Sequence, residues 1–142
     1  MICGIAIVLM TVFLSISLVH VYWAVGGRVG QLAAIPERDG KPVFHPSTIM
    51  TAVVALILAL CAVLIAATGG LLALPLPEPA LAWLTRALAV GLLLRAIGDF
   101  RLVGFFKRVR DTRFAQLDTV LYSQLCLMLA TGCAIVGLAA HA

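Results

Sequence analysis

Long uncharged apolar runs are the feature that most constrains this chain. Residues 2–25, 48–68 and 119–140 contain no Asp, Glu, Lys or Arg, and the runs are 24, 21 and 22 residues long. An α-helix rises about 1.5 Å per residue, so each run is long enough to cross a hydrocarbon core about 30 Å thick. We therefore predict that all three runs are transmembrane helices.

One more span, the third in chain order, is expected at residues 80–106, although four charged side chains interrupt it: Arg86, Arg95, Asp99 and Arg101. An Arg or Asp at the bilayer centre costs roughly 2.5–3.5 kcal/mol on insertion scales, so these groups must snorkel, pair or face a polar interior. We expect this helix to be the most buried of the four. The predicted fold class is an all-α, polytopic four-helix transmembrane bundle that forms one domain over residues 1–142.

Composition supports a membrane protein. Hydrophobic residues make up 63% of the chain and charged residues 11%, against roughly 45–50% and about 25% in soluble domains. A soluble protein of 142 residues has too little interior to bury that much apolar surface, so the lipid bilayer is the expected partner. A cleaved signal peptide is disfavoured because residues 2–25 lack a basic leader and a small-residue cleavage pattern.

Basic residues predict the orientation. Connector 71–79 has none. The connector between spans 2–25 and 48–68 carries Arg28, Arg38 and Lys41, and the connector between spans 80–106 and 119–140 carries Lys107, Arg108, Arg110 and Arg113. By the positive-inside rule both basic connectors are cytoplasmic, and both termini lie outside. This topology signal is a sufficient explanation for the basic residues, so no nucleic-acid partner is expected.

No metal or cofactor is expected. The four cysteines, Cys3, Cys61, Cys126 and Cys133, lack the CxxC or Cys/His spacing that zinc or dithiol sites use. His20 has no second histidine within the apolar runs with which to form a bis-histidine haem site.

Polar residues on different helices are expected at similar depth near the cytoplasmic face. His20 lies about 7.5 Å before the end of run 2–25 and Asp99 about 10 Å before residue 106, while Tyr122 lies one turn into run 119–140. Arg95 and Asp99 are four residues apart on one helix face, which predicts an ion pair. Such a pair either pins helix packing or marks a substrate, proton or headgroup site.

We therefore consider three classes of function. In the first, a cytoplasm-facing pocket binds or translocates a small polar or amphipathic ligand; in the second, a membrane enzyme acts on a lipid or quinone-like substrate with His20 or Asp99 as acid/base; in the third, the chain is a structural subunit. Transport by so few helices would require a homo-oligomer. The expected ligand-binding residues are His20, Trp23, Arg95, Asp99, Arg101 and Tyr122.

The connector between the first two spans is also a candidate element of the site. It has 21 residues from Gly26 to Pro46 and lies on the same side as the polar cluster, and loops of this length are often functional. We expect it to act as a lid and to include a short helix around residues 31–35.

Three segments carry a resemblance to a known family: HVYWAVGG, PVFHP and RAIGDFRLVGFFKRVRDTRFAQLDTVLYSQLC. In this respect the chain resembles a family of small bacterial four-helix membrane proteins of unknown function, over nearly its whole length. The family pattern has Pro after LYS, whereas Gln124 follows Ser123 here. The resemblance implies a four-helix fold in the bacterial inner membrane and implies no activity.

Overall fold

Four long helical segments form the molecule, whose computed structural model describes residues 1–38 and 41–140. The first three are α1 (Ile2–Ala24), α2 (Thr48–Thr68) and α3 (Glu78–Ile97). The fourth consists of α4 (Arg113–Leu117), a π-helical turn η2 (Asp118–Tyr122) and α5 (Ser123–Ala139). All four are long and apolar enough to cross a membrane, which confirms the prediction of an all-α membrane fold.

Local signals in the sequence set several helix ends. The Ser47 hydroxyl accepts a hydrogen bond from Met50 N at the start of α2, and Thr112 does the same for Ala115 N at the start of α4. Each thereby satisfies an amide that has no partner within its helix. Gly69 and Gly70 end α2, and Gly70 has a φ of +75°, a conformation that glycine adopts without steric cost.

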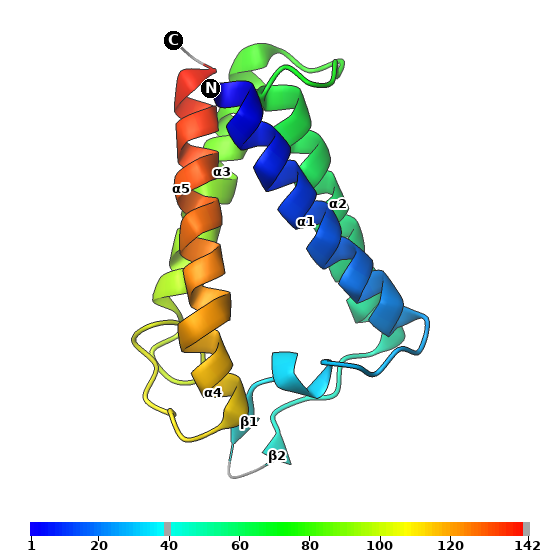
Figure 1. Cartoon of the computed structure of the whole chain (residues 1–142), viewed down its shortest axis with the longest axis vertical. Helices are drawn as coiled ribbons and strands as arrows, with labels where there is room; N and C mark the ends of the chain where they lie inside the picture. Colours follow the sequence, from blue (N-terminus) through cyan, green and yellow to red (C-terminus); the bar gives the residue numbers. More distant parts are fainter. Residues whose placement is uncertain (39–40, 141–142) are drawn as a thin grey trace.

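The helices pack as two hairpin-like pairs. α1 lies against α2, and α3 lies against α5. Figure 1 shows the two pairs in contact near the chain termini and spread apart at the opposite end, so the molecule has the outline of a wedge. α1 and α5 face the viewer in this orientation, with α2 and α3 behind them.

The narrow end of the wedge holds the core. Phe13, Ile65, Cys133 and Val136 are all buried there, together with Ala6 and other small residues. Close approach depends on glycine, because a Cβ on Gly69 would collide with that of Ala6. Small residues at helix contacts are how membrane helices gain packing contacts without a hydrophobic driving force.

Hydrogen bonds link neighbouring helices within the span. Ser17 donates to the carbonyl of Ala55 at 2.7 Å and so joins α1 to α2, and the hydroxyls of Thr68 and Thr85 are 2.8 Å apart between α2 and α3. Interhelical hydrogen bonds of this kind contribute about 0.6–2 kcal/mol each in membrane proteins. They fix the relative rotation of the helices.

Two predicted spans have different ends in the structure. The span expected at residues 80–106 stops at Ile97 because Gly98 adopts a φ of +92° and starts an irregular segment, residues 98–112. The span expected at residues 119–140 begins earlier, at Arg113, and ends at Ala139. The expectation that the third helix is the most buried is also wrong: the final segment is, because its face includes the buried Asp118 and Ser123.

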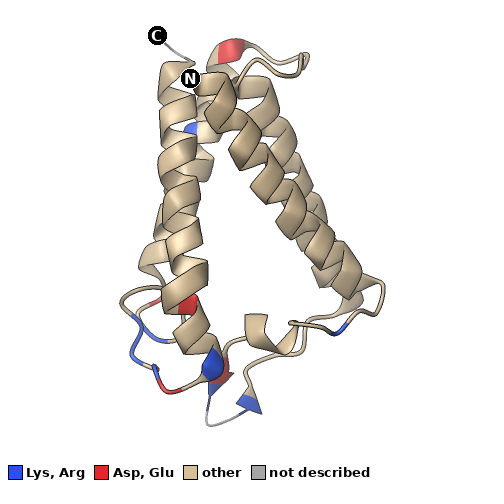
Figure 2. Cartoon of the chain, in the orientation of Figure 1, with Lys and Arg blue, Asp and Glu red and all other residues tan. Residues whose placement is uncertain are grey.

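The connector between α1 and α2 closes the wide end. It contains a 3₁₀ turn, η1 (Leu32–Ala34), which confirms the short helix expected around residues 31–35, and a small antiparallel pair of strands, β1 (Glu37–Arg38) and β2 (Lys41–Pro42). Lys and Arg residues gather at this end of the molecule (Figure 2).

Candidate functional site

A buried carboxylate lies within the α3/α5 pair toward the wide end, and sequence reasoning did not select it. Asp118 is fully buried in η2. Its Oδ1 accepts from Arg95 Nη2 at 2.9 Å, and its Oδ2 accepts from Gly104 N at 2.7 Å, Lys107 Nζ at 3.1 Å and Ser123 Oγ at 3.2 Å. We call these five residues the Asp118 cluster. It ties α3, segment 98–112 and the last helical segment together.

Lys107 belongs to this cluster rather than to the basic surface. Its ammonium group donates to Asp118, to the carbonyl of Gly104 at 3.0 Å and to the hydroxyl of Thr119 at 2.6 Å. Its three donors therefore all have acceptors, which is the condition under which a buried lysine is tolerated. The expectation that Lys107 serves only as a topology signal is incomplete.

The π-helical turn places the carboxylate. η2 runs from Asp118 to Tyr122, and the Ser123 hydroxyl reaches back five residues to Asp118. Single π-helical turns within α-helices often occur at functional sites because they shift the side chains that follow relative to a regular helix. Here the turn carries Asp118 at one end and Tyr122 at the other.

The predicted ion pair between Arg95 and Asp99 is wrong, because Arg95 pairs with Asp118. The spacing argument assumed that both residues lie on one helix, but α3 ends at Ile97 and Asp99 lies outside it. Asp99 instead accepts hydrogen bonds from the backbone N–H groups of Arg101, Leu102 and Val103. Slight burial raises the pKa of Asp99. The hydrogen bonds from these N–H groups lower the pKa by more than burial raises it, so the pKa lies below its ordinary value.

The cluster carries an excess of positive charge. Two cations, Arg95 and Lys107, share one carboxylate. The Lys107 side chain is 1% exposed and that of Arg95 is 37% exposed, so the excess charge reaches a surface through Arg95. The Arg95 Nη1 atom is buried and has no hydrogen-bond acceptor within residues 1–38 and 41–140.

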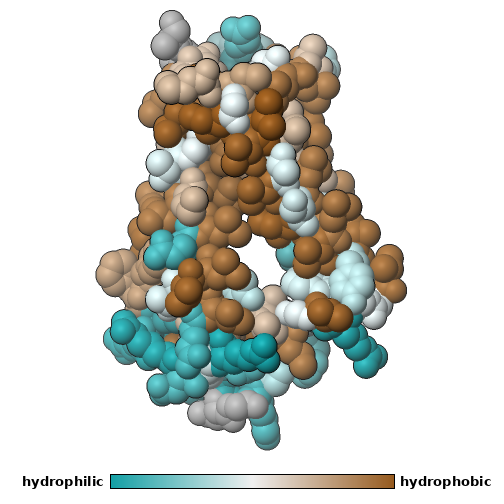
Figure 3. Space-filling view, in the orientation of Figure 1, coloured by the Kyte–Doolittle hydropathy of each residue, from teal (hydrophilic) through white to brown (hydrophobic). Residues whose placement is uncertain are grey.

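That surface is a cavity of about 540 Å³ between α1, η1, α3 and the last helical segment, which we call the seam cavity. It brings together four of the six predicted ligand-binding residues, His20, Trp23, Arg95 and Tyr122. The remaining wall is mainly apolar, with Ile16, Val19, Phe114, Leu121 and Leu125 among its residues. Figure 3 shows an opening between the two helix pairs that is bordered largely by hydrophobic side chains.

The polar residues of the seam cavity are held by defined contacts. His20 Nδ1 lies 2.8 Å from the carbonyl of Ile16, which can only accept, so Nδ1 carries a proton and Nε2 of the neutral ring is an acceptor. The Tyr122 hydroxyl donates to the carbonyl of Ala33 at 3.2 Å, and Trp23 Nε1 donates to that of Val29 at 2.8 Å. Both contacts tether the connector to the helices.

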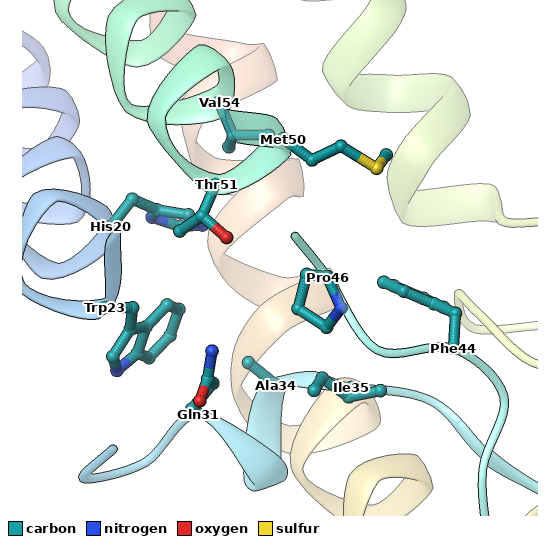
Figure 4. A pocket seen from close by; sticks show the side chains of 10 residues that line it. All are labelled: His20, Trp23, Gln31, Ala34, Ile35, Phe44, Pro46, Met50, Thr51 and Val54. Atoms are coloured by element: carbon teal, nitrogen blue, oxygen red, sulfur yellow. The ribbon is translucent and has the colours of Figure 1, made fainter. Parts of the chain in front are cut away.

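A second, smaller opening lies on the other side of His20. This pocket of about 230 Å³ shares His20, Trp23 and Ala34 with the seam cavity and is completed by the connector and α2. In Figure 4 the side chains of His20, Gln31 and Thr51 come from three different elements and border the same space. The connector therefore lines part of both spaces.

Asp99 and Arg101, the other two predicted site residues, lie elsewhere. They line a shallow groove on segment 98–112 together with Arg38, Phe100, Arg108 and Val109. Both are exposed at the wide end and do not border the seam cavity.

Sequence spacing contained a signal for Asp118 that the depth argument did not use. Phe114, Ala115 and Asp118 recur at intervals of one to four residues and are all buried. That spacing is the pattern of one helix face. A carboxylate on the apolar face of a span requires a cation, although the spacing does not indicate which Lys or Arg supplies it.

Comparison with known proteins gives one match. No curated protein and no solved structure matches the chain. The model of the family described as "Protein of unknown function (DUF3995)" matches residues 13–133, which include α2, α3, the Asp118 cluster and all the residues that line the seam cavity. This multi-pass membrane protein therefore belongs to the DUF3995 family.

Proposed function

We propose that this chain is a binding protein of the bacterial inner membrane that takes an amphipathic anion into the seam cavity. The anionic head lies against Arg95, and the apolar part lies between α1 and α5. His20, Trp23 and Tyr122 flank the head group. In the proposed orientation the wide end faces the cytoplasm, because it carries the basic connectors.

The observation that carries this proposal is the charge imbalance of the Asp118 cluster. Asp118 neutralises one of two cations, and the partly exposed one borders a mainly apolar space. A cation beside an apolar, poorly hydrated wall attracts an anion more strongly than it would in water. A purely structural ion pair would need one cation for the one carboxylate.

The alternatives gain less support from the arrangement. An enzyme would need an acid or base at the reacting group, and Asp99 lies outside the cavity while Asp118 is sealed by four donors. Of the two acid/base candidates, His20 and Asp99, His20 therefore remains. A structural subunit would need no charged side chain at an open cavity.

The test uses Trp23 as a reporter of occupancy. The chain has two tryptophans, and Trp83→Phe leaves Trp23, which lines the cavity, as the single tryptophan of the protein. The variant is reconstituted in nanodiscs and titrated with α-bromodecanoate, whose bromine quenches a nearby indole. We expect saturable quenching, and we expect the uncharged methyl ester of the same acid to quench at least tenfold more weakly.

The charge requirement is tested with matched arginine variants. Arg95→Gln should weaken binding of α-bromodecanoate at least tenfold, because a hydrogen bond to a charged group contributes about 1.5–3 kcal/mol and each 1.4 kcal/mol is about tenfold. Arg86→Gln is the control: Arg86 donates to the carbonyl of Gly137 near the narrow end and does not line the cavity. Equal affinities in both variants would contradict the proposal.

A further inference from the structure

The seam between α1 and α5 does not end at the seam cavity. A second space of about 440 Å³ continues along it toward the chain termini, and Leu125 borders both spaces. We call this second space the tail groove. It is almost entirely apolar, and its walls are Met1, Gly4, Ile5, Val8, Leu9 and Val12 of the N-terminal helix and Leu125, Met128, Leu129 and Gly132 of α5.

One helix face of α1 lines both spaces. Its positions recur every three or four residues, from Gly4, Val8 and Val12 in the tail groove to Ser15, Val19 and Trp23 in the seam cavity. Such spacing places side chains in one stripe along a helix. The two spaces therefore form one path along the seam, with Arg95 and His20 at the wide end and only apolar side chains at the other.

Glycine keeps the groove open at its far end. A Cβ built on Gly4 meets no atom within 4 Å. At Gly132 a Cβ would approach the side chain of Leu9, so glycine lets α5 and α1 come together behind the groove.

The length of the path matches an acyl chain. Val8 precedes His20 by twelve residues, or about 18 Å of helix. An extended hydrocarbon chain with C–C bonds of about 1.5 Å advances about 1.25 Å per bond, so a 16-carbon acid spans ~19 Å and a 10-carbon acid ~11 Å. A 16-carbon chain whose head lies at Arg95 therefore reaches Val8, whereas a 10-carbon chain ends before it.

The charge of the Asp118 cluster selects the head group. Among residues 1–38 and 41–140, two cations against one carboxylate leave one uncompensated positive charge in the Asp118 cluster. One charge balances a monoanionic carboxylate and not a dianionic phosphate monoester. On the basis of the proposed function, we infer that the ligand is a long-chain fatty acid anion, with its carboxylate at Arg95 and its chain in the tail groove.

The experiment blocks the tail groove without touching the head site. Val8→Phe places a larger side chain in the groove, and Val90→Phe on α3 is the matched control, because the two valines are 62% and 55% exposed and Val90 lines neither space. Both changes are made in the Trp83→Phe background. Quenching of Trp23 is then measured with α-bromohexadecanoate and with α-bromodecanoate at equal mole fractions in nanodiscs.

We expect Val8→Phe to weaken hexadecanoate binding at least fivefold and to leave decanoate binding unchanged, with Val90→Phe changing neither. Retained decanoate binding also shows that the Val8→Phe protein is folded. Equal effects on the two acids, or no effect on either, would overturn the tail groove while leaving the proposed function intact if Arg95→Gln still weakens decanoate binding. If Arg95→Gln has no effect, the proposed function itself fails.

Two further outcomes bear on the ligand class. Quenching by α-bromohexadecanoate that rises with mole fraction and never saturates would mean contact with surrounding lipid and would overturn the inference. Displacement of α-bromohexadecanoate by unlabelled hexadecanoate at lower mole fraction than by a lysophosphatidate of the same chain length supports the carboxylate. The reverse order would overturn it.

Discussion

Lys107 Nζ lies 3.1 Å from Asp118 Oδ2, and both side chains are buried. The contact joins segment 98–112 to η2, eleven residues further along the chain. Because Arg95 shares the same carboxylate, loss of Asp118 leaves two cations without a counterion, whereas loss of Lys107 leaves an intact pair.

This asymmetry predicts unequal effects of substitution. Asp118→Leu should lower the free energy of unfolding by about 3–5 kcal/mol, the cost of leaving a buried charge unpaired. Adding Lys107→Met should recover part of that loss, since it removes the sealed cation. Unfolding temperatures in detergent measure both, and Asp111→Asn, at an exposed acid of the same segment, is the control. Losses that simply add would argue against coupling.

The turn after α3 predicts a glycine requirement. Gly98 and Gly104 have φ values of +92° and +90°. A Cβ on Gly98 would collide with the backbone of Val103, and a Cβ on Gly104 would collide with the backbone of Ile97 and Gly98. Gly98→Ala and Gly104→Ala should each destabilise the protein by at least about 1–2 kcal/mol, because L-residues disfavour this conformation. Gly91→Ala should be neutral or stabilising by up to about 1 kcal/mol, since Gly91 lies in a helix with open space around it. A similar effect at all three sites would contradict the packing described for the turn.

Acid should weaken the turn through Asp99. Its pKa lies below the ordinary value of 3.8, so the folded state favours the ionised form. The contribution of Asp99 to stability is therefore fully present above about pH 4 and is lost as the pH falls through the lowered pKa. Thermal unfolding followed down to about pH 3 should show a loss in the parent protein that is smaller in Asp99→Asn. An acid-dependent loss of the same size in both proteins would exclude this role.

Tyr122 should limit the opening of the connector. Its hydroxyl donates to the carbonyl of Ala33, and a hydrogen bond of this type contributes about 0.5–1.5 kcal/mol. Tyr122→Phe should therefore speed backbone amide exchange in η1 by roughly twofold to tenfold. Tyr22→Phe removes a hydroxyl from an exposed ring on α1 and should leave the rate unchanged. Equal rates in the parent and Tyr122→Phe would mean that this tether does not hold the connector.

The proposed orientation, with the wide end in the cytoplasm, predicts which connectors are accessible from each side of the membrane. In a background with the native cysteines replaced, Glu78→Cys at the start of α3 and Arg110→Cys in segment 98–112 should react with a membrane-impermeant maleimide from opposite sides. Arg110→Cys should be protected in intact cells and Glu78→Cys should not. The opposite pattern would invert the orientation, and labelling of both from one side would contradict four spans.

The sequence was sufficient to predict the four spans, because apolar length and the absence of charge determine what inserts into a bilayer. Helix rise converts position into depth, and His20 and Tyr122, which were assigned similar depths, do line one cavity, whereas Asp99, assigned a similar depth, does not. Depth alone does not identify the helix end. The positive φ of Gly98 is a backbone property, and a helical extrapolation through it placed Asp99 on the wrong element.

The partner of Arg95 required tertiary information. Asp118 is 23 residues away in the chain and reaches Arg95 because α3 packs against α5, which continues directly from η2. Lys107 lies in a basic run of the sequence, and only the fold of segment 98–112 turns its side chain inward. Local spacing rules describe neighbours on one helix and contain no information on which helices meet.

The wedge outline of the helix pairs has a consequence for the surrounding membrane. The narrow end and the wide end lie in different leaflets when the four helices span the bilayer, so the protein occupies more area in one leaflet than in the other (Figure 1). Fewer lipids therefore fit around the chain in the leaflet that holds the wide end than in the leaflet that holds the narrow end.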